Sequence, residues 1–209
     1  MDDLMTRAAA PAAPVPGWVT SADGTPIAYE RRGGGPPLVL VGGALSTGVG
    51  AWRLAGLLAE RFTTYTYDRR GRGGSGCEAA AYDPRREVED LAAVLAVAGA
   101  GAGVHGLSSG GALVLEAAAA GVPMGRVSVY EPPYGADEDA HDGVPVHRLA
   151  RVRRRVLVLD GGASPQWLRD AARAVARALP YGRHATLTGQ THVVAPHVLA
   201  PAVAGFHTE

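Results

Sequence analysis

The chain has 209 residues, of which 47% are apolar, and its 20 basic side chains are balanced by 20 acidic ones. This length favours a single domain with a substantial core, and the formal net charge of zero disfavours nucleic-acid binding, which depends on a basic excess. The sequence has no run of about 20 apolar residues, the length that a membrane span needs, so we expect no membrane partner.

The N-terminal residues and the cysteine content predict the cellular compartment of the protein. The single cysteine, Cys77, excludes an internal disulfide and fits a reducing compartment. The first residues lack the cationic and apolar regions of a signal peptide, so we expect a cytoplasmic protein, and the abundance of Arg, Ala and Gly is typical of a GC-rich bacterial source. Residues 1–16, rich in Ala and Pro, are expected to form a flexible tail, and residues 17–209 a single domain.

Strand-like and helix-like segments alternate through this domain. Strands are expected at residues 18–21, 27–31, 37–41, 63–67, 103–105, 126–130, 155–159 and 185–187. Helices are expected at residues 52–61, 83–98, 109–120, 164–179 and 196–206. Short links between alternating elements predict an α/β fold, with a mostly parallel central sheet and helices on both faces.

The most informative segment is Gly106–Gly110, which reads G-L-S-S-G and fits the G-x-S-x-G nucleophile elbow. It lies between a short apolar strand and an alanine-rich helix, where a sharp turn requires small neighbours. Such a turn presents the Ser108 hydroxyl at the N-terminus of a helix, where the backbone N–H of Ser109 can help to hold an oxyanion. Ser108 is therefore the candidate nucleophile.

Further segments accompany the elbow in a fixed order along the chain. They are Val39–Ala44, Tyr67–Gly76 (Y-D-R-R-G-R-G-G-S-G), Tyr130–Pro133, Val158–Gly162 and Gly189–His192. Together with the elbow, these segments resemble those of the α/β-hydrolase superfamily over residues 18–206. The resemblance implies the α/β-hydrolase fold, a serine nucleophile at Ser108 and a general base at His192, which would take the serine proton and return it to the leaving group.

The acidic partner of His192 is less regular. Many relatives carry an Asp after the penultimate strand in a Gly-x-x-Asp pattern, but the corresponding position here is Ser164, which we interpret as a helix N-cap. Two carboxylates could replace the missing Asp. Glu131 ends the strand after the elbow helix, a position that some lipases of this fold use, and it is the favoured acid. Asp160 ends the next strand and is the alternative.

The remaining site residues follow from the same resemblance. The oxyanion hole would be the backbone N–H groups of Ala44 and Ser109. Gly43 has no side chain to block a carbonyl group, and Tyr134 is expected to line the mouth of the site, with Trp52 and Trp167 as weaker candidates.

The connection at residues 132–154 is too short for a cap of several helices, so we expect a minimal cap or none. An open site favours cleavage of an ester, lactone or thioester of a small-molecule acyl substrate, without a metal or an organic cofactor. An exposed apolar rim could also support a homodimer. The alternatives are a non-hydrolytic lyase, cyclase or isomerase on the same scaffold, and a non-catalytic small-molecule-binding relative.

Overall fold

The computed structural model describes residues 13–44, 48–77, 83–135 and 144–209, with the backbone alone at residues 48–52. Eight strands form one sheet in the order β1-β2-β4-β3-β5-β6-β7-β8. Their bounds are β1 Val15–Thr20, β2 Pro26–Arg32, β3 Pro37–Val41, β4 Thr63–Tyr67, β5 Gly103–Leu107, β6 Val127–Tyr130, β7 Val156–Gly161 and β8 Gly182–Leu187. Strand β2 is antiparallel to both β1 and β4, whereas all other neighbours are parallel.

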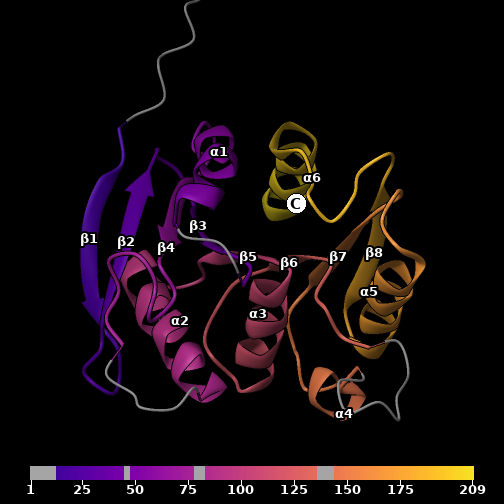
Figure 1. Cartoon of the computed structure of the whole chain (residues 1–209), viewed down its shortest axis with the longest axis horizontal. Coiled ribbons are helices and arrows are strands. Elements are labelled where there is room, and N and C mark those ends of the chain that lie inside the picture. The colour runs from indigo at the N-terminus through magenta and orange to yellow at the C-terminus, as the bar shows by residue number, and fades with distance from the viewer. Residues whose placement is uncertain (1–12, 45–47, 78–82, 136–143) are drawn as a thin grey trace, which may run out of the picture.

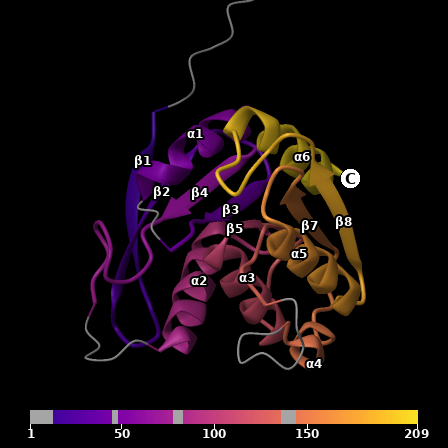
Figure 2. The same ribbon diagram turned by 45° about the vertical axis from the view of Figure 1, so that its right-hand side comes forward.

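Helices cover both faces of this sheet. Their bounds are α1 Gly48–Leu58, α2 Pro84–Ala98, α3 Ser109–Ala119, α4 Val146–Leu149, α5 Gln166–Ala178 and α6 Pro196–Thr208. Helices α1 and α6 lie on one face, and α2, α3 and α5 lie on the other (Figures 1 and 2). This is the expected α/β architecture.

The core consists of two apolar layers separated by the sheet, as β3 illustrates. Leu38 and Leu40 pack in the layer beneath α1 and α6. Val39 and Val41 pack in the opposite layer with α2, α3 and α5. Because successive side chains of a strand point to opposite faces, a strand buried on both sides is continuously apolar, as the sequence of β3 is.

Most element boundaries agree with the sequence expectations, and the exceptions are local. Strand β1 begins at Val15, two residues before the expected domain boundary. Helix α5 begins at Gln166 with Pro165 at its N-cap and no side-chain cap bond, so the expectation that Ser164 caps this helix is wrong. Between β6 and β7 the described residues contain only the four-residue helix α4, as a minimal cap requires, and residues 136–143 lie outside the description.

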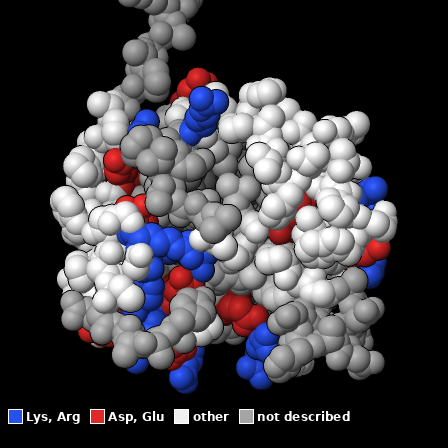
Figure 3. Space-filling view, in the orientation of Figure 1, with Lys and Arg blue, Asp and Glu red and all other residues white. Residues whose placement is uncertain are grey.

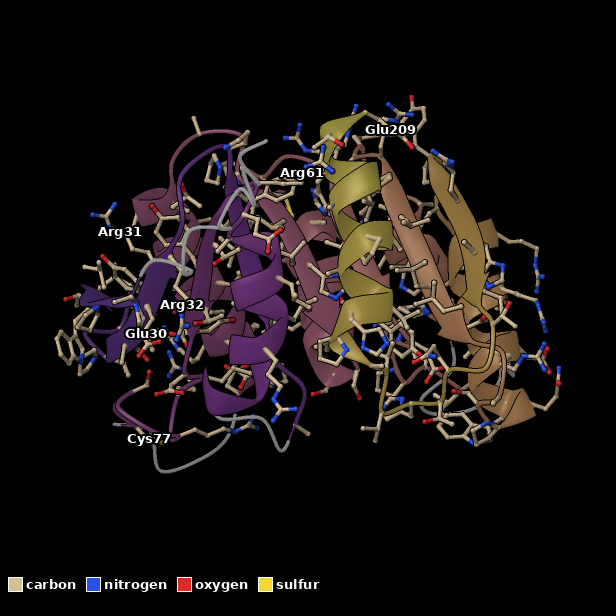
Figure 4. All side chains as sticks on the ribbon, turned by 90° about the horizontal axis from the view of Figure 1, so that it is seen from above. Glu30, Arg31, Arg32, Arg61, Cys77 and Glu209 are labelled. Atoms are coloured by element: carbon tan, nitrogen blue, oxygen red, sulfur yellow. The ribbon has the colours of Figure 1, made fainter. Side chains whose placement is uncertain are left out.

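The parallel strands end at one edge of the sheet, which we call the carboxyl edge. Figure 4 shows Cys77, in the turn after β4, at this edge, and Glu209, at the end of α6, at the opposite edge. The segments that follow β3, β5, β6 and β8 all reach the carboxyl edge, so residues far apart in sequence meet there. Among the described residues, no helix combines the length and the apolar character that a membrane crossing needs.

Candidate active site

The turn between β5 and α3 holds Ser108 in a strained conformation, with φ 50° and ψ −124°. The flanking glycines make this turn possible. A Cβ atom on Gly106 would lie 2.6 Å from the Cα of Gly111, and one on Gly110 would lie 2.4 Å from the carbonyl oxygen of Val41. Glycine at position 106 therefore lets α3 approach β5, and glycine at position 110 lets α3 approach the end of β3.

The Ser108 hydroxyl meets a histidine from the loop after β8. Nε2 of His192 lies 3.1 Å from Oγ of Ser108, and Nδ1 of His192 lies 2.7 Å from Oε2 of Glu131. The imidazole therefore bridges a hydroxyl and a carboxylate, with one ring nitrogen directed at each. This is the arrangement of an activated serine nucleophile with a base and an orienting acid.

Glu131 is held rigidly beneath the histidine. Its side chain is completely buried, and its Oε1 accepts a 2.8 Å hydrogen bond from the backbone N–H of Gly161. Its own backbone N–H donates to the carbonyl of Leu159, and its φ is 43°. Glu131 and Ser108 are the two described non-glycine residues with positive φ, so the backbone strain of the chain is concentrated where the hydroxyl and the carboxylate are presented.

The alternative acid, Asp160, does not join this arrangement. Its Oδ2 lies 2.9 Å from Nε2 of His184 rather than near His192. The reason is strand alternation: Asp160 lies within β7, on the same face as Val158, which packs in the layer of α2, α3 and α5. Val158 is opposite His184 in the register of β7 and β8, so Asp160 and His184 are diagonal neighbours on one face.

The segment expected to form the oxyanion hole approaches the hydroxyl closely. A Cβ on Gly43 would lie 3.3 Å from the Cβ of Ser108, so a larger residue here would crowd the site. Ala44 follows at the end of the described segment, and Ser109 occupies the first turn of α3. Ser109 is therefore directly beside Ser108, and Ala44 lines the same cavity as Ser108.

Two arginines after β4 hold this segment in place. Nη1 of Arg69 donates to the carbonyl of Gly42 at 3.4 Å and to Oγ of Ser109 at 3.0 Å, and Nη1 of Arg72 donates to the carbonyl of Gly43 at 3.1 Å. Arg69 is itself paired with the buried Glu87 of α2. Both arginines belong to the Tyr67–Gly76 segment that the sequence analysis singled out.

The histidine loop has its own anchor, which the sequence analysis missed. The hydroxyl of Tyr130 donates to the carbonyl of Thr191 at 2.6 Å, immediately before His192. Tyr130 precedes Glu131 in the chain, so one short segment supplies both the carboxylate and the support of the histidine backbone. Burial raises the pKa of the Tyr130 hydroxyl, which therefore remains a hydrogen-bond donor.

A cavity of about 340 Å³ opens onto the hydroxyl and the imidazole. Its lining includes Gly43, Ala44, Ser108 and His192, together with the apolar residues Leu54, Leu107, Val193, Val194, Pro196 and Leu199. The His192 side chain is 41% exposed and can reach a bound molecule. The described residues contain no grouping of three His, Cys, Asp or Glu side chains suited to a metal ion.

The aromatic residues that the sequence analysis considered for the mouth of the active site lie in separate places. Tyr134 lines a second cavity, on the side of α2 and α3, where its hydroxyl approaches the carbonyl of Ala112 at 3.4 Å and Oε1 of Glu116 at 3.3 Å. Trp167 is 54% exposed on α5. The side chain of Trp52 lies outside the described residues.

This fold and this site define a class of protein, that of α/β hydrolases with a serine at the elbow. A model of the alpha/beta hydrolase family matches residues 38–207, so the chain belongs to that family. A search of curated proteins gave no significant match.

Solved structures support the same assignment. An alpha/beta hydrolase from Sphaerobacter thermophilus is 38% identical, with a TM-score of 0.86 over 91% of this chain and 100% of that one. The naproxen esterase (carboxylesterase NP) of Bacillus subtilis is 15% identical, with a TM-score of 0.80 over 93% and 92% of the two chains. The enol-lactonase of Burkholderia xenovorans is 16% identical, with a TM-score of 0.79 over 92% and 100%. The last two similarities concern the fold alone.

Proposed function

We propose that the protein is a serine hydrolase that cleaves a carboxylic ester, lactone or thioester through an acyl-enzyme on Ser108. The observation that carries this proposal is the continuous path from the Ser108 hydroxyl through His192 to the buried carboxylate of Glu131. The esterase and the lactonase among the structural matches are consistent with the same reaction class.

In the acylation step, Nε2 of His192 takes the proton of Ser108 as Oγ attacks the carbonyl carbon of the substrate. Nδ1–H of His192 donates to Oε2 of Glu131, which fixes the tautomer and stabilises the imidazolium that forms. The negative charge on the carbonyl oxygen is stabilised by the backbone N–H groups of Ala44 and Ser109. Collapse of the tetrahedral intermediate breaks the bond to the leaving group, which receives the proton from His192.

Deacylation repeats the same proton transfers with water. His192 takes a proton from the water molecule that attacks the acyl-enzyme, and it returns this proton to Oγ of Ser108 when the carboxylic acid leaves. The proton transfer between Oγ of Ser108 and Nε2 of His192 spans 3.1 Å, which is within the range for general acid–base catalysis.

The direct test is labelling with a fluorophosphonate probe, with the modified peptide identified by mass spectrometry. We expect one adduct at Ser108, because the probe reacts with a serine that an adjacent base activates. His192→Ala is the control: it leaves the serine in place, and we expect it to reduce the labelling rate strongly, by about 10³-fold or more. Folded protein that is not labelled, or that is labelled equally fast in the control, would refute the proposed nucleophile.

A further inference from the structure

Arg72 lies directly behind the segment proposed to form the oxyanion hole. Its Nη1 donates a 3.1 Å hydrogen bond to the carbonyl oxygen of Gly43. This carbonyl belongs to the peptide unit that joins Gly43 to Ala44, and the N–H of the same unit is the proposed oxyanion donor. One hydrogen bond and one peptide unit therefore separate the guanidinium group from the place where the oxyanion would form.

The geometry of this peptide unit determines where its N–H points. None of the described peptide bonds is cis, and in a planar trans peptide the carbonyl and the N–H point in opposite directions. Because the carbonyl of Gly43 is directed at Arg72, the N–H of Ala44 is directed away from it. Ala44 lines the cavity of Ser108 and His192, whereas Arg72 is not among the described residues of its wall. The N–H therefore lies on the cavity side of the peptide, opposite the arginine.

Two backbone N–H groups beside Ser108 are open to a ligand. Among the described residues, none accepts a hydrogen bond from the N–H of Ala44. The N–H of Ser109, at the first position of α3, has no partner within the helix. The helix fixes the direction of the second donor, whereas the bond from Arg72 fixes that of the first.

The charge of Arg72 also differs from that of its neighbours in the turn after β4. Arg69 is paired with Glu87 and Arg70 with Asp90, two carboxylates of α2. Figure 3 shows acidic and basic side chains lying next to one another on the lower half of the face, over α2 and α3. In the part of the chain that the structure describes, no carboxylate forms an ion pair with Arg72. Its positive charge therefore acts on the Gly43 carbonyl and on charge that develops beyond it.

We propose that Arg72 is a positioning residue of the oxyanion hole, which orients and polarises the peptide unit that carries the N–H of Ala44. A hydrogen bond to the carbonyl of a peptide strengthens the bond that its N–H makes, and a charged acceptor gains most from a stronger donor. This inference rests on the proposed function, because an oxyanion forms only if Oγ of Ser108 adds to a carbonyl group.

The first test is the hydrolysis of phenyl acetate by Arg72→Met, which removes the guanidinium and keeps a long side chain. We expect kcat to fall by about 10- to 100-fold, less than on loss of an oxyanion donor itself, since Ala44 retains its N–H. KM should stay within about threefold, because the oxyanion forms only after the substrate has bound. Arg72→Lys keeps a charged donor and should lose less than about tenfold in kcat. Arg153→Met is the control: Arg153 is exposed just before β7, at the edge of the sheet opposite the site, and this variant should keep kcat.

Inhibition by benzyl trifluoromethyl ketone separates this role from a merely structural one. Oγ of Ser108 adds to its carbonyl carbon, the electron pair of the C=O bond moves to the oxygen, and the serine proton passes to His192, so the adduct carries the oxyanion. Its inhibition constant is measured from the protection of Ser108 against the fluorophosphonate probe, which requires no substrate. We expect this constant to rise in Arg72→Met by about 10- to 100-fold, as kcat/KM falls, and to be largely restored in Arg72→Lys.

The inhibition constant decides the outcome. A constant within about threefold of that of the unmodified protein, in folded Arg72→Met, would overturn the proposed role of Arg72 and leave the serine hydrolase intact. If Arg72→Met does not fold, Arg72→Gln, which is also uncharged, takes its place with the same expectation. An unmodified protein that is not labelled at Ser108 and does not hydrolyse phenyl acetate would instead refute the proposed function, and this inference with it.

Discussion

Among the residues that the structure describes, a serine and a histidine are hydrogen-bonded in two clusters, and one of the two has the features of a reactive site. At the carboxyl edge, Ser108 contacts His192, which contacts Glu131. Inside the fold, Oγ of Ser128 on β6 lies 3.0 Å from Nε2 of His207 on α6 and 2.8 Å from Nδ1 of His105 on β5.

The two clusters differ in their third partner and in their surroundings. The first ends in a carboxylate that can stabilise an imidazolium, whereas the second ends in another imidazole, His105. Ser108 is at a strained turn beside a cavity, whereas Ser128 is a completely buried residue within a regular strand. A serine–histidine contact is therefore not sufficient for nucleophilic chemistry, which also depends on the turn, the acid and access for the substrate.

The largest expected difference between the clusters is in catalysis. Ser108→Ala should reduce kcat for an ester substrate by about 10⁴-fold or more, because it removes the proposed nucleophile. Ser128→Ala should leave kcat within about twofold and instead lower the free energy of unfolding by about 1–3 kcal/mol, since it leaves a buried imidazole without a hydrogen-bond partner. Steady-state kinetics and urea unfolding of the two variants check both statements. A large loss of kcat in a well-folded Ser128→Ala variant would remove the distinction between the clusters.

The next largest effect concerns the acid. Glu131→Gln keeps an acceptor for the N–H of Gly161 but cannot orient and stabilise the charged imidazole as a carboxylate does, so kcat should fall by about 10²- to 10⁴-fold. Asp160→Asn is the matched control, because Asp160 is equally buried at the end of β7 but is bonded to His184. We expect the control to retain kcat within about threefold. The reverse order of the two effects would make Asp160 the acid.

Much of this architecture could be predicted from local patterns. The apolar run at Pro37–Val41 and the Gly106–Gly110 turn are short-range signals, because a strand buried on both faces and a sharp turn each impose their residue types directly. The distant segments of the site could be placed together because parallel strands end at one edge of the sheet.

The parts that required the structure depend on contacts between distant side chains. The sequence favoured Glu131 but kept Asp160 as the alternative, since the direction of a side chain at the end of a strand depends on the backbone angles there. The positive φ of Glu131 turns its carboxylate to His192, whereas Asp160 keeps the regular alternation of β7. The cavity wall containing Tyr134 likewise depends on how α2, α3 and the segment after β6 pack, which no local pattern determines.

The smallest expected effect is the pH dependence that the buried cluster gives to the free energy of unfolding. Burial lowers the pKa of His207 to about 4 and that of His105 to about 3, and each is lowered further by a positive charge close by, which is Arg126 for His207 and protonated His207 for His105. Nε2 of His105 has no hydrogen-bond partner among the described residues, so the folded state gains nothing by protonating it. Both histidines are therefore neutral in the folded protein at neutral pH.

The sign of the pH dependence follows from these shifts. Above pH 6.5, the ordinary pKa of a histidine, the folded and unfolded states are both neutral at these positions, and stability does not depend on them. Below it, the unfolded chain binds protons that the folded protein cannot, so stability falls by about 1.4 kcal/mol per pH unit for each histidine until its folded pKa is reached. His207→Gln retains a hydrogen-bonding side chain but no titratable group. In urea unfolding between pH 6.5 and pH 4.5, its free energy of unfolding should therefore change less steeply with pH than that of the unmodified protein, by about one proton. His197→Gln, at an exposed position on the same helix, is the control for the loss of a histidine. Parallel curves for His207→Gln and the unmodified protein would show that His207 is not held neutral by the fold.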